Sequence, residues 1–170
     1  MMMITQETIR EVSENIIRIL PVPHDQYAIV GSSEGWWTVT NSQKLINNAR
    51  TRKKALGEDD TVINVIFYRR YFALETMIIG NKHKGQGCES KIIDLLLQKS
   101  KELSMPLVVM ETEGESIPLV ESKELKESVT RMDTTTSGNE LKIFVISESA
   151  LQKEHEAVVT EIRECYLDDN

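Results

Sequence analysis

The 170-residue chain is poor in the residues that hold disulfide-rich, metal-dependent or fibrous proteins together. Its two cysteines, Cys88 and Cys165, form no Cys-x-x-Cys pair and its three histidines are scattered, which excludes a disulfide scaffold and the usual zinc-ligand spacing. Eight glycines and four prolines are too few for a collagen or a long disordered chain. No apolar run approaches the roughly 18 residues of a membrane span. We therefore expect a folded protein with two reduced thiols and no metal.

The first residues also lack the pattern of a secretory signal, and we expect none. Residues 1–7 contain neither a basic start nor an apolar core. Together with the reduced thiols, this predicts a cytoplasmic protein that has no membrane partner. The length fits one domain, or one domain with an added helix, and a chain of this size buries roughly 70% of its unfolded surface.

Charge is unevenly distributed along the chain, whose formal net charge is −7. Residues 44–91 hold ten Lys or Arg against five Asp or Glu, whereas residues 111–170 hold six against fifteen. The middle of the chain should attract an anion, and the acidic last third should favour a cationic partner. Trp36 and Trp37, with the basic run at 50–54, leave a nucleic-acid stacking platform open, but the negative net charge disfavours it.

Apolar periodicity predicts an α/β (α+β) fold with a single mixed, mostly antiparallel sheet and one strand–helix–strand crossover over 72–110. Thr5 should cap the first helix, and Pro21 should end it. The predicted helices are 5–20, 42–55, 87–103, 117–127 and 149–166, and the predicted strands are 27–30, 36–40, 62–67, 71–79, 107–110, 128–132 and 141–146.

Two units are expected. Residues 1–147 should form a single α/β domain, with an N-terminal amphipathic helix inside 1–24. Residues 148–170 should form an acidic amphipathic helix with an apolar stripe. This helix either packs on its own domain or binds a protein partner or a second copy of the chain, so a homodimer stays open.

The most informative segment is a strand-to-helix turn with the sequence Lys84-Gly85-Gln86-Gly87. Backbone N–H groups at the start of a helix, together with the helix dipole, form an anion site. The two glycines allow a close approach of the backbone, and Lys82, His83 and Lys84 add positive charge. The pattern matches neither the P-loop nor the dinucleotide-binding glycine motif. It indicates a phosphate or pyrophosphate site, with a purely structural turn as the alternative.

This segment resembles the acyl-CoA-binding motif of the GCN5-related N-acetyltransferases. Lys84, Gly85 and Gly87 fall on the basic and glycine positions of that motif, and Ile79 falls on its strand-end apolar position. The order of predicted elements is similar over about 71–147. The resemblance implies an acyl-CoA N-acyltransferase-like fold that uses acetyl-CoA.

The resemblance also implies roles for particular residues. Glu75 would deprotonate the acceptor amine, directly or through water. Ser122 is the hydroxyl nearest the position of the tyrosine with which the family protonates the departing thiolate. The backbone of Ile78 and Ile79 would pair with the pantetheine arm of coenzyme A. Its pyrophosphate would bind the amides of Lys84, Gly85, Gln86, Gly87, Cys88, Glu89 and Ser90.

Two functions follow as alternatives. The first is an N-acyltransferase that moves an acetyl group from acetyl-CoA to a small-molecule or protein amine. The second is a non-catalytic protein of the same fold that contacts nucleic acid or a protein, because Glu89 stands where the family has a small residue. The position of Cys88 at a helix start could lower the pKa of its thiol, but we do not expect Cys88 to act as a nucleophile.

Overall fold

The computed structural model describes residues 4–31, 36–49, 51, 55–111, 120, 128–136 and 138–167. They form one seven-stranded sheet of order β1-β2-β3-β4-β5-β7-β6, in which only the β4–β5 pair is parallel. The predicted single mixed, mostly antiparallel sheet is confirmed. The strands are β1 (Ala28–Gly31), β2 (Trp36–Thr40), β3 (Val62–Phe67), β4 (Phe72–Ile78), β5 (Leu107–Glu111), β6 (Ser128–Thr136) and β7 (Asn139–Ser147).

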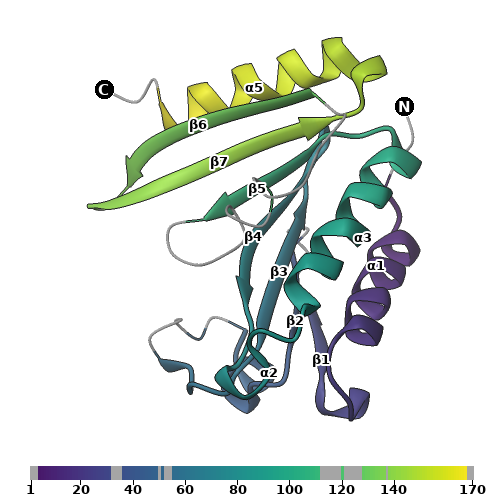
Figure 1. The fold of residues 1–170 in the computed structure, drawn as a ribbon, viewed down its shortest axis with the longest axis vertical. Coiled ribbons are helices and arrows are strands. Elements are labelled where there is room, and N and C mark those ends of the chain that lie inside the picture. The colour runs from purple at the N-terminus through teal and green to yellow at the C-terminus, as the bar shows by residue number, and fades with distance from the viewer. Residues whose placement is uncertain are drawn as a thin grey trace.

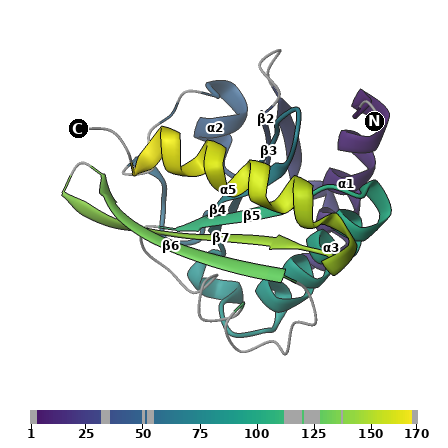
Figure 2. The ribbon, with the colours of Figure 1, turned by 90° about the horizontal axis from the view of Figure 1, so that it is seen from above.

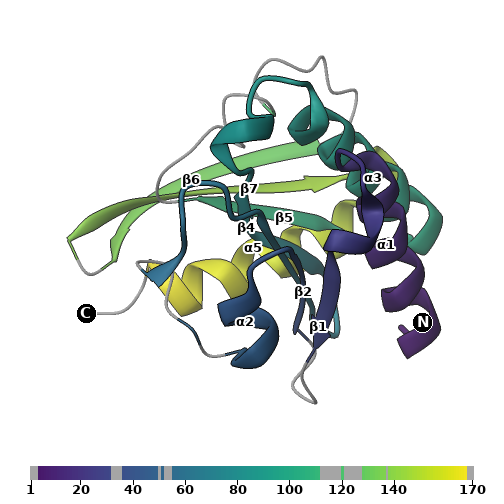
Figure 3. The same ribbon diagram turned by 90° about the horizontal axis from the view of Figure 1, so that it is seen from below.

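Helices cover both faces of this sheet (Figures 1 and 2). Helices α1 (Gln6–Ile19) and α3 (Cys88–Leu103) lie on one face. Helices α2 (Gln43–Asn47) and α5 (Gln152–Tyr166) lie on the other, as the view from below also shows (Figure 3). Connections between elements include the 3-10 turns η1 (His24–Gln26), η3 (Asn81–His83) and η4 (Ser149–Leu151). In the part of the chain described, no helix is both long and apolar enough to cross a membrane.

The larger core lies between the sheet and the α1–α3 pair. Ile92 and Leu96 of α3 are fully buried against Phe72 and Leu74 of β4. The two helices are also joined by a buried ammonium, because Lys99 lies 2.8 Å from Glu11 of α1 and 2.9 Å from Glu102. Hydrogen bonds to both carboxylates raise the pKa of Lys99, although burial opposes the shift.

A second core lies between the sheet and α5. Val158 and Ile162 are fully buried there, against Val108 of β5 and Val145 of β7. These apolar residues of α5 repeat at a spacing of four, which places them on one helical stripe. The acidic amphipathic helix therefore packs on the sheet of its own chain.

Most predicted elements are confirmed, including the Thr5 cap, whose hydroxyl accepts a hydrogen bond from the Thr8 N–H at 3.1 Å. The prediction of a helix over 42–55 is wrong in length, because α2 ends at Asn47. The predicted helix at 117–127 lies outside the described residues except for Val120, which is helical and buried.

Candidate functional site

The parallel strands β4 and β5 pair along only part of their length. The register joins Phe72, Ala73 and Leu74 to Leu107, Val108 and Val109, and pairing then stops although both strands continue. Figure 1 shows the two strands diverging beyond this point. The backbone of 75–78 therefore faces β5 without a ladder to it, so an extended ligand arm could pair there as an added strand.

A β-bulge sits where the strands part. Between β3 and β4, Val65 pairs with Leu74 and Asn64 pairs with Thr76, so Glu75 is the extra residue. Leu74 and Met77 both pack toward the α1–α3 core, which leaves Glu75 and Thr76 on the α5 side of the sheet. Glu75 is exposed. The bulge thus presents a carboxylate beside the divergence of β4 and β5.

The turn from β4 to α3 has an open backbone. Gly85 and Gly87 have φ angles of 79° and 86°, in the left-handed region that favours glycine. A Cβ at either position would meet no atom within 4 Å. Gly87 is the N-cap and offers no side chain to the helix, whose Lys91 N–H donates to the Gly87 carbonyl at 3.3 Å. The first turn of α3 therefore presents its amides to an uncovered turn.

The start of this turn is held by the loop before β3. The Gly80 N–H donates to the Thr61 hydroxyl at 3.0 Å, and the Asn81 N–H donates to the Glu58 carbonyl at 2.8 Å. A Cβ at Gly80 would collide with the backbone carbonyl of Asp59. Gly80 is thus required for close packing, whereas Gly85 and Gly87 are required by their backbone angles, so the turn is anchored at one end and open at the other.

Charges around the turn are mixed. Lys82 and Lys84 are exposed, and Lys91 is exposed on the first turn of α3. Glu89 is half-buried, and its Oε1 atom is enclosed without a hydrogen-bond partner among the described residues. The Asp59 carboxylate also lies at the turn, where its Oδ1 accepts a hydrogen bond from the Lys82 N–H at 3.2 Å. Three cations therefore stand against two carboxylates, which leaves the turn suited to an anion.

Cys88 is buried below the turn and not within it. Its thiol donates to the Ile19 carbonyl at 3.7 Å, at the end of α1. Burial raises the pKa of the Cys88 thiol, and the neighbouring Glu89 raises it further. The expectation of a lowered thiol pKa at this helix start is therefore wrong, because the side chain points into the core, and Cys88 is not an activated nucleophile.

Three tyrosines gather near Glu75. The rings of Tyr68 and Tyr71 stack with their centroids 4.7 Å apart across the β3–β4 turn, and Tyr166 packs on the same core from the end of α5. Burial raises the pKa of all three phenols, and the charge of Glu75 raises the pKa of Tyr68 and Tyr166 further. Glu161 adds a second carboxylate beside Tyr68 and Tyr71. Aromatic faces and carboxylates together favour a cation.

The predicted site residues thus fall in two places along one strand. Glu75 lies at the bulge, and Ile78, Ile79 and the turn that follows lie at the end of β4. Ser122 lies outside the described residues. The sequence did not predict that Tyr68, Tyr71 and Tyr166 lie together. Its only indication was the pair of tyrosines that flank Arg69 and Arg70 at a tight turn.

The predicted nucleic-acid platform has an unfavourable setting. Trp37 packs against Gly31 and lines a cavity with α1 residues, where Glu7, Glu11 and Glu14 outnumber Arg10. A phosphate backbone would be repelled from such a surface. The basic residues 50 and 52–54 lie outside the described residues. Among the residues that are described, no group of His, Cys, Asp and Glu is placed to hold a metal ion.

Comparison with solved structures finds three matching chains, of which two are given below. No protein-family model matches the chain, and no curated protein does. A crystal structure of a protein from Agrobacterium tumefaciens, provisionally assigned as an acetyltransferase, aligns with 86% of this chain and 96% of its own, at 6% identity and a TM-score of 0.38. A crystal structure of a ribosomal-protein alanine N-acetyltransferase from Escherichia coli aligns with 85% of this chain and 91% of its own, at 12% identity and a TM-score of 0.39. Such low scores establish no relationship, so the function must be inferred from the chain's own residues.

Proposed function

We propose that the protein is an acetyl-CoA-dependent N-acyltransferase. The observation that carries the proposal is the parting of β4 from β5 after Leu74 and Val109, next to an uncovered two-glycine turn at the start of α3. One strand end can thus offer its backbone to an extended pantetheine arm while the adjoining amides receive a pyrophosphate. The resemblance of the turn to the acyl-CoA-binding motif assigns the same two roles.

The residues present fit coenzyme A at this turn. Gly85 and Gly87 leave space where side chains would stand, and Lys82 and Lys84 supply positive charge at its rim. The amides of 84–90 would hold the pyrophosphate, and the backbone of Ile78 and Ile79 would hold the pantetheine arm. When bound, acetyl-CoA supplies an activated acetyl group as a thioester.

Glu75 is placed to take the acceptor's proton. An amine nitrogen attacks the thioester carbonyl carbon, the new C–N bond forms, and the C–S bond breaks. The proton lost by the nitrogen passes to the Glu75 carboxylate, directly or through water. The thiolate takes up a proton, for which Ser122 remains the predicted donor. The tyrosines and Glu161 beside Glu75 would hold a cationic acceptor, such as a polyamine, a lysine side chain or an aminoglycoside.

Calorimetry with acetyl-CoA tests the proposal. We expect micromolar binding in the wild-type chain and none in Gly87→Glu, whose side chain would fill the turn with negative charge. Gly138→Glu is the matched control, because Gly138 also has a positive φ of 82° and open space around it but lies at the tip of the β6–β7 turn. Glu89→Gln should tighten binding roughly fivefold, because it removes a carboxylate beside the amides that would bind the pyrophosphate.

The competing function is a non-catalytic protein of the same fold. The enclosed Oε1 of Glu89, beside the amides that should bind an anion, is the observation that favours it. Absence of acetyl-CoA binding in both the wild-type chain and Glu89→Gln, with retention on heparin, would support this alternative and rule out the transferase.

A further inference from the structure

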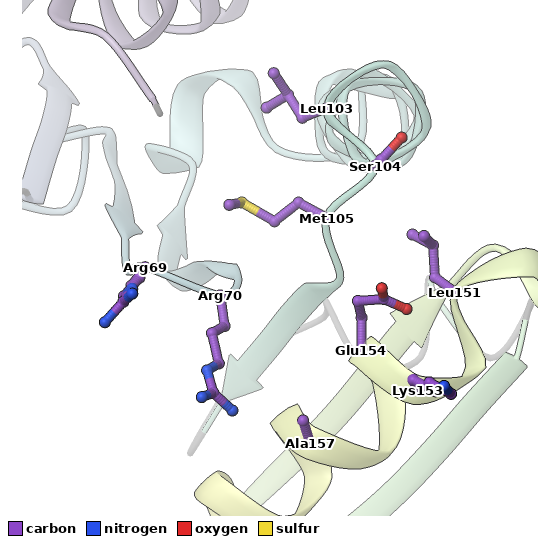
Figure 4. A pocket seen from close by; sticks show the side chains of 9 residues that line it. All are labelled: Arg69, Arg70, Leu103, Ser104, Met105, Leu151, Lys153, Glu154 and Ala157. Atoms are coloured by element: carbon purple, nitrogen blue, oxygen red, sulfur yellow. The ribbon is translucent and has the colours of Figure 1, made fainter. Parts of the chain in front are cut away.

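A second cavity lies at the opposite end of β4 from the glycine turn. Its volume is about 690 Å³, within the usual range for small-molecule sites. Three elements that are distant in sequence form it (Figure 4). They are the β3–β4 turn, the end of α3 with the two residues that follow it, and the end of η4 with the start of α5. The lining residues are Arg69, Arg70, Leu103, Ser104, Met105, Leu151, Lys153, Glu154 and Ala157.

The cavity combines an apolar wall with excess positive charge. Leu103, Met105, Leu151 and Ala157 supply the apolar part. Arg69, Arg70 and Lys153 supply three cations against the single carboxylate of Glu154. In Figure 4, Arg70 and Met105 border the same space as Glu154 and Ala157 of α5. Such a lining suits a ligand that is apolar at one end and anionic at the other.

The conformation of the β3–β4 turn does not require arginine at positions 69 and 70. Arg69 and Arg70 form the tip of a two-residue loop that is closed by a hydrogen bond from the Tyr68 N–H to the Tyr71 carbonyl at 2.9 Å. Such loops favour asparagine and glycine with positive φ, yet neither arginine has a positive φ. Both are exposed, and neither guanidinium has an ion-pair or hydrogen-bond partner among the described residues.

The loop that carries the arginines is rigidly held. The stacked rings of Tyr68 and Tyr71 flank it, and the Phe72 N–H donates to the Pro106 carbonyl at 3.2 Å. Two guanidiniums on a fixed loop lose less entropy when they bind an anion than they would on a mobile segment. Arginine also matches carboxylate and phosphate oxygens in a bidentate manner.

The other wall carries a strained residue. Ser104 follows the end of α3 with a φ of 50°, and it is the only non-glycine residue with a positive φ in the part of the chain described. Glycine or asparagine is the usual choice at such a position. A serine held there retains a hydroxyl on the cavity wall at some cost in backbone energy.

We propose that this cavity binds a small amphipathic organic anion, with its carboxylate or phosphate at Arg69 and Arg70 and its apolar part against Leu103, Met105 and Leu151. The site is separate from the glycine turn, since all seven residues of β4 lie between them. It does not depend on the proposed transferase function.

NMR titration of the full chain tests this proposal, with octanoate and octyl phosphate as the probes. We expect submillimolar binding of at least one probe, with amide shifts at Arg69, Arg70, Ser104 and Met105. The two probes distinguish a carboxylate from a phosphate head group. Octylammonium, which has the same tail but the opposite charge, should bind at least roughly tenfold more weakly.

Variants distinguish specific binding at this cavity from non-specific binding to the protein surface. Arg70→Gln should weaken binding roughly tenfold or more, whereas Arg10→Gln, an equally exposed arginine on α1, should leave it unchanged. Glu154→Gln should tighten binding about threefold. Gly87→Glu should still bind octanoate, so loss of the coenzyme A site and loss of this site are distinguishable.

Three outcomes would overturn the proposal. Equal binding of octanoate and octylammonium would mean an apolar surface without charge recognition. An absence of shifts at the cavity amides at millimolar probe would mean no site. Concentration-dependent dimerisation in sedimentation that is abolished by Arg70→Gln would mean that a second copy of the chain occupies the cavity instead.

Discussion

The bulge in β4 brings Glu75 and Thr76 to the same face of the sheet. Without the bulge, strict alternation along the strand would place residues 75 and 76 on opposite faces of the sheet. With it, both lie on the face that α5 covers, and Glu75 lies near Tyr68 and Tyr166. Glu75 thus shares the face of Ala73, and the bulge adds Thr76 beside it at the place where β4 leaves β5.

Replacing this carboxylate tests its role as a base. In Glu75→Gln we expect acetyl transfer to fall by roughly 10²-fold or more, because the amide cannot take the proton of the amine. Affinity for acetyl-CoA should stay unchanged, because the backbone of 78–79 and the amides of 84–90 that would bind it lie farther along the chain. Release of free thiol, followed with polyamines, lysine peptides and aminoglycosides as acceptors, measures the turnover.

Glu161→Gln is the matched control for that change. Glu161 lies in the same tyrosine group, so its loss removes one charge from the same surface without removing the base. We expect a rise in the acceptor KM and a change in turnover of only a few fold. Full turnover in Glu75→Gln would remove Glu75 from the mechanism.

Sequence reasoning succeeded where the constraint is local. Gly85 and Gly87 could be identified because positive φ leaves few alternatives to glycine. The grouping of Tyr68 with Tyr166 could not be identified, because it depends on the direction in which α5 crosses the sheet. No spacing of residues in the sequence specifies that direction. The bulge at Glu75 could not be predicted from the sequence either, since it is a property of the pairing between β3 and β4.

At the scale of single elements, α2 shows how a helical pattern is cut short. The sequence predicts a helix over 42–55, yet α2 ends at Asn47. The Thr51 hydroxyl donates to the carbonyls of Lys44 and Asn48, at 3.1 and 2.7 Å. The Thr51 N–H also donates to the Asn48 carbonyl, at 3.0 Å, so both polar groups of Thr51 bind this carbonyl just past the helix end. Asparagine at 47–48 is in addition a weak helix former.

Helix α5 is fixed to the sheet by a buried histidine as well as by apolar packing. The His155 ring lies 2.8 Å from the Thr130 hydroxyl at Nε2 and 2.8 Å from the Ser147 hydroxyl at Nδ1. Burial lowers the pKa of His155, and the nearby Glu156 opposes this shift only in part. The lowered pKa favours the neutral imidazole, whose two nitrogens are both paired to neutral hydroxyls.

This arrangement predicts a pH-dependent stability. Because the pKa of His155 is lower in the folded chain than in the unfolded chain, unfolding takes up a proton at mildly acid pH. The stabilisation is complete above the unfolded pKa of about 6.5 and is lost as pH falls toward the folded value, by at most about 1.4 kcal/mol per pH unit. Urea unfolding between about pH 5.5 and 7.5 measures it.

The comparison variants are His155→Gln and His83→Gln. The first should be less stable at neutral pH, because a poorer fit replaces the ring, but its stability should vary less with pH over this range. The second replaces a half-buried histidine on η3 and should keep the slope of the wild-type chain. An unchanged slope in His155→Gln would show that other groups cause the acid sensitivity.

At the scale of the whole molecule, the two proposed binding sites lie at opposite ends of β4. One end leads into the glycine turn, and the other begins at the arginine loop beside α5. The crossover from β4 through α3 to β5 could be predicted, because a parallel pair requires a long connection and the segment between these strands has helical periodicity. The point at which β4 and β5 stop pairing could not be predicted, because the residues of both strands keep a high strand propensity beyond it.

The fate of the chain without its last helix decides whether 1–147 is an independent domain, as the sequence suggests. Val158 and Ile162 are fully buried against β5 and β7, so removing α5 would expose the apolar face formed by Tyr71, Val108 and Val145. We expect a chain ending at residue 147 to aggregate, or to keep helical circular dichroism while losing cooperative thermal unfolding, whereas one ending at residue 167 should unfold like the full chain. A monomeric, cooperatively folded 1–147 fragment would show instead that α5 is an appendage, and its exposed sheet face would then be free for a partner or a second copy.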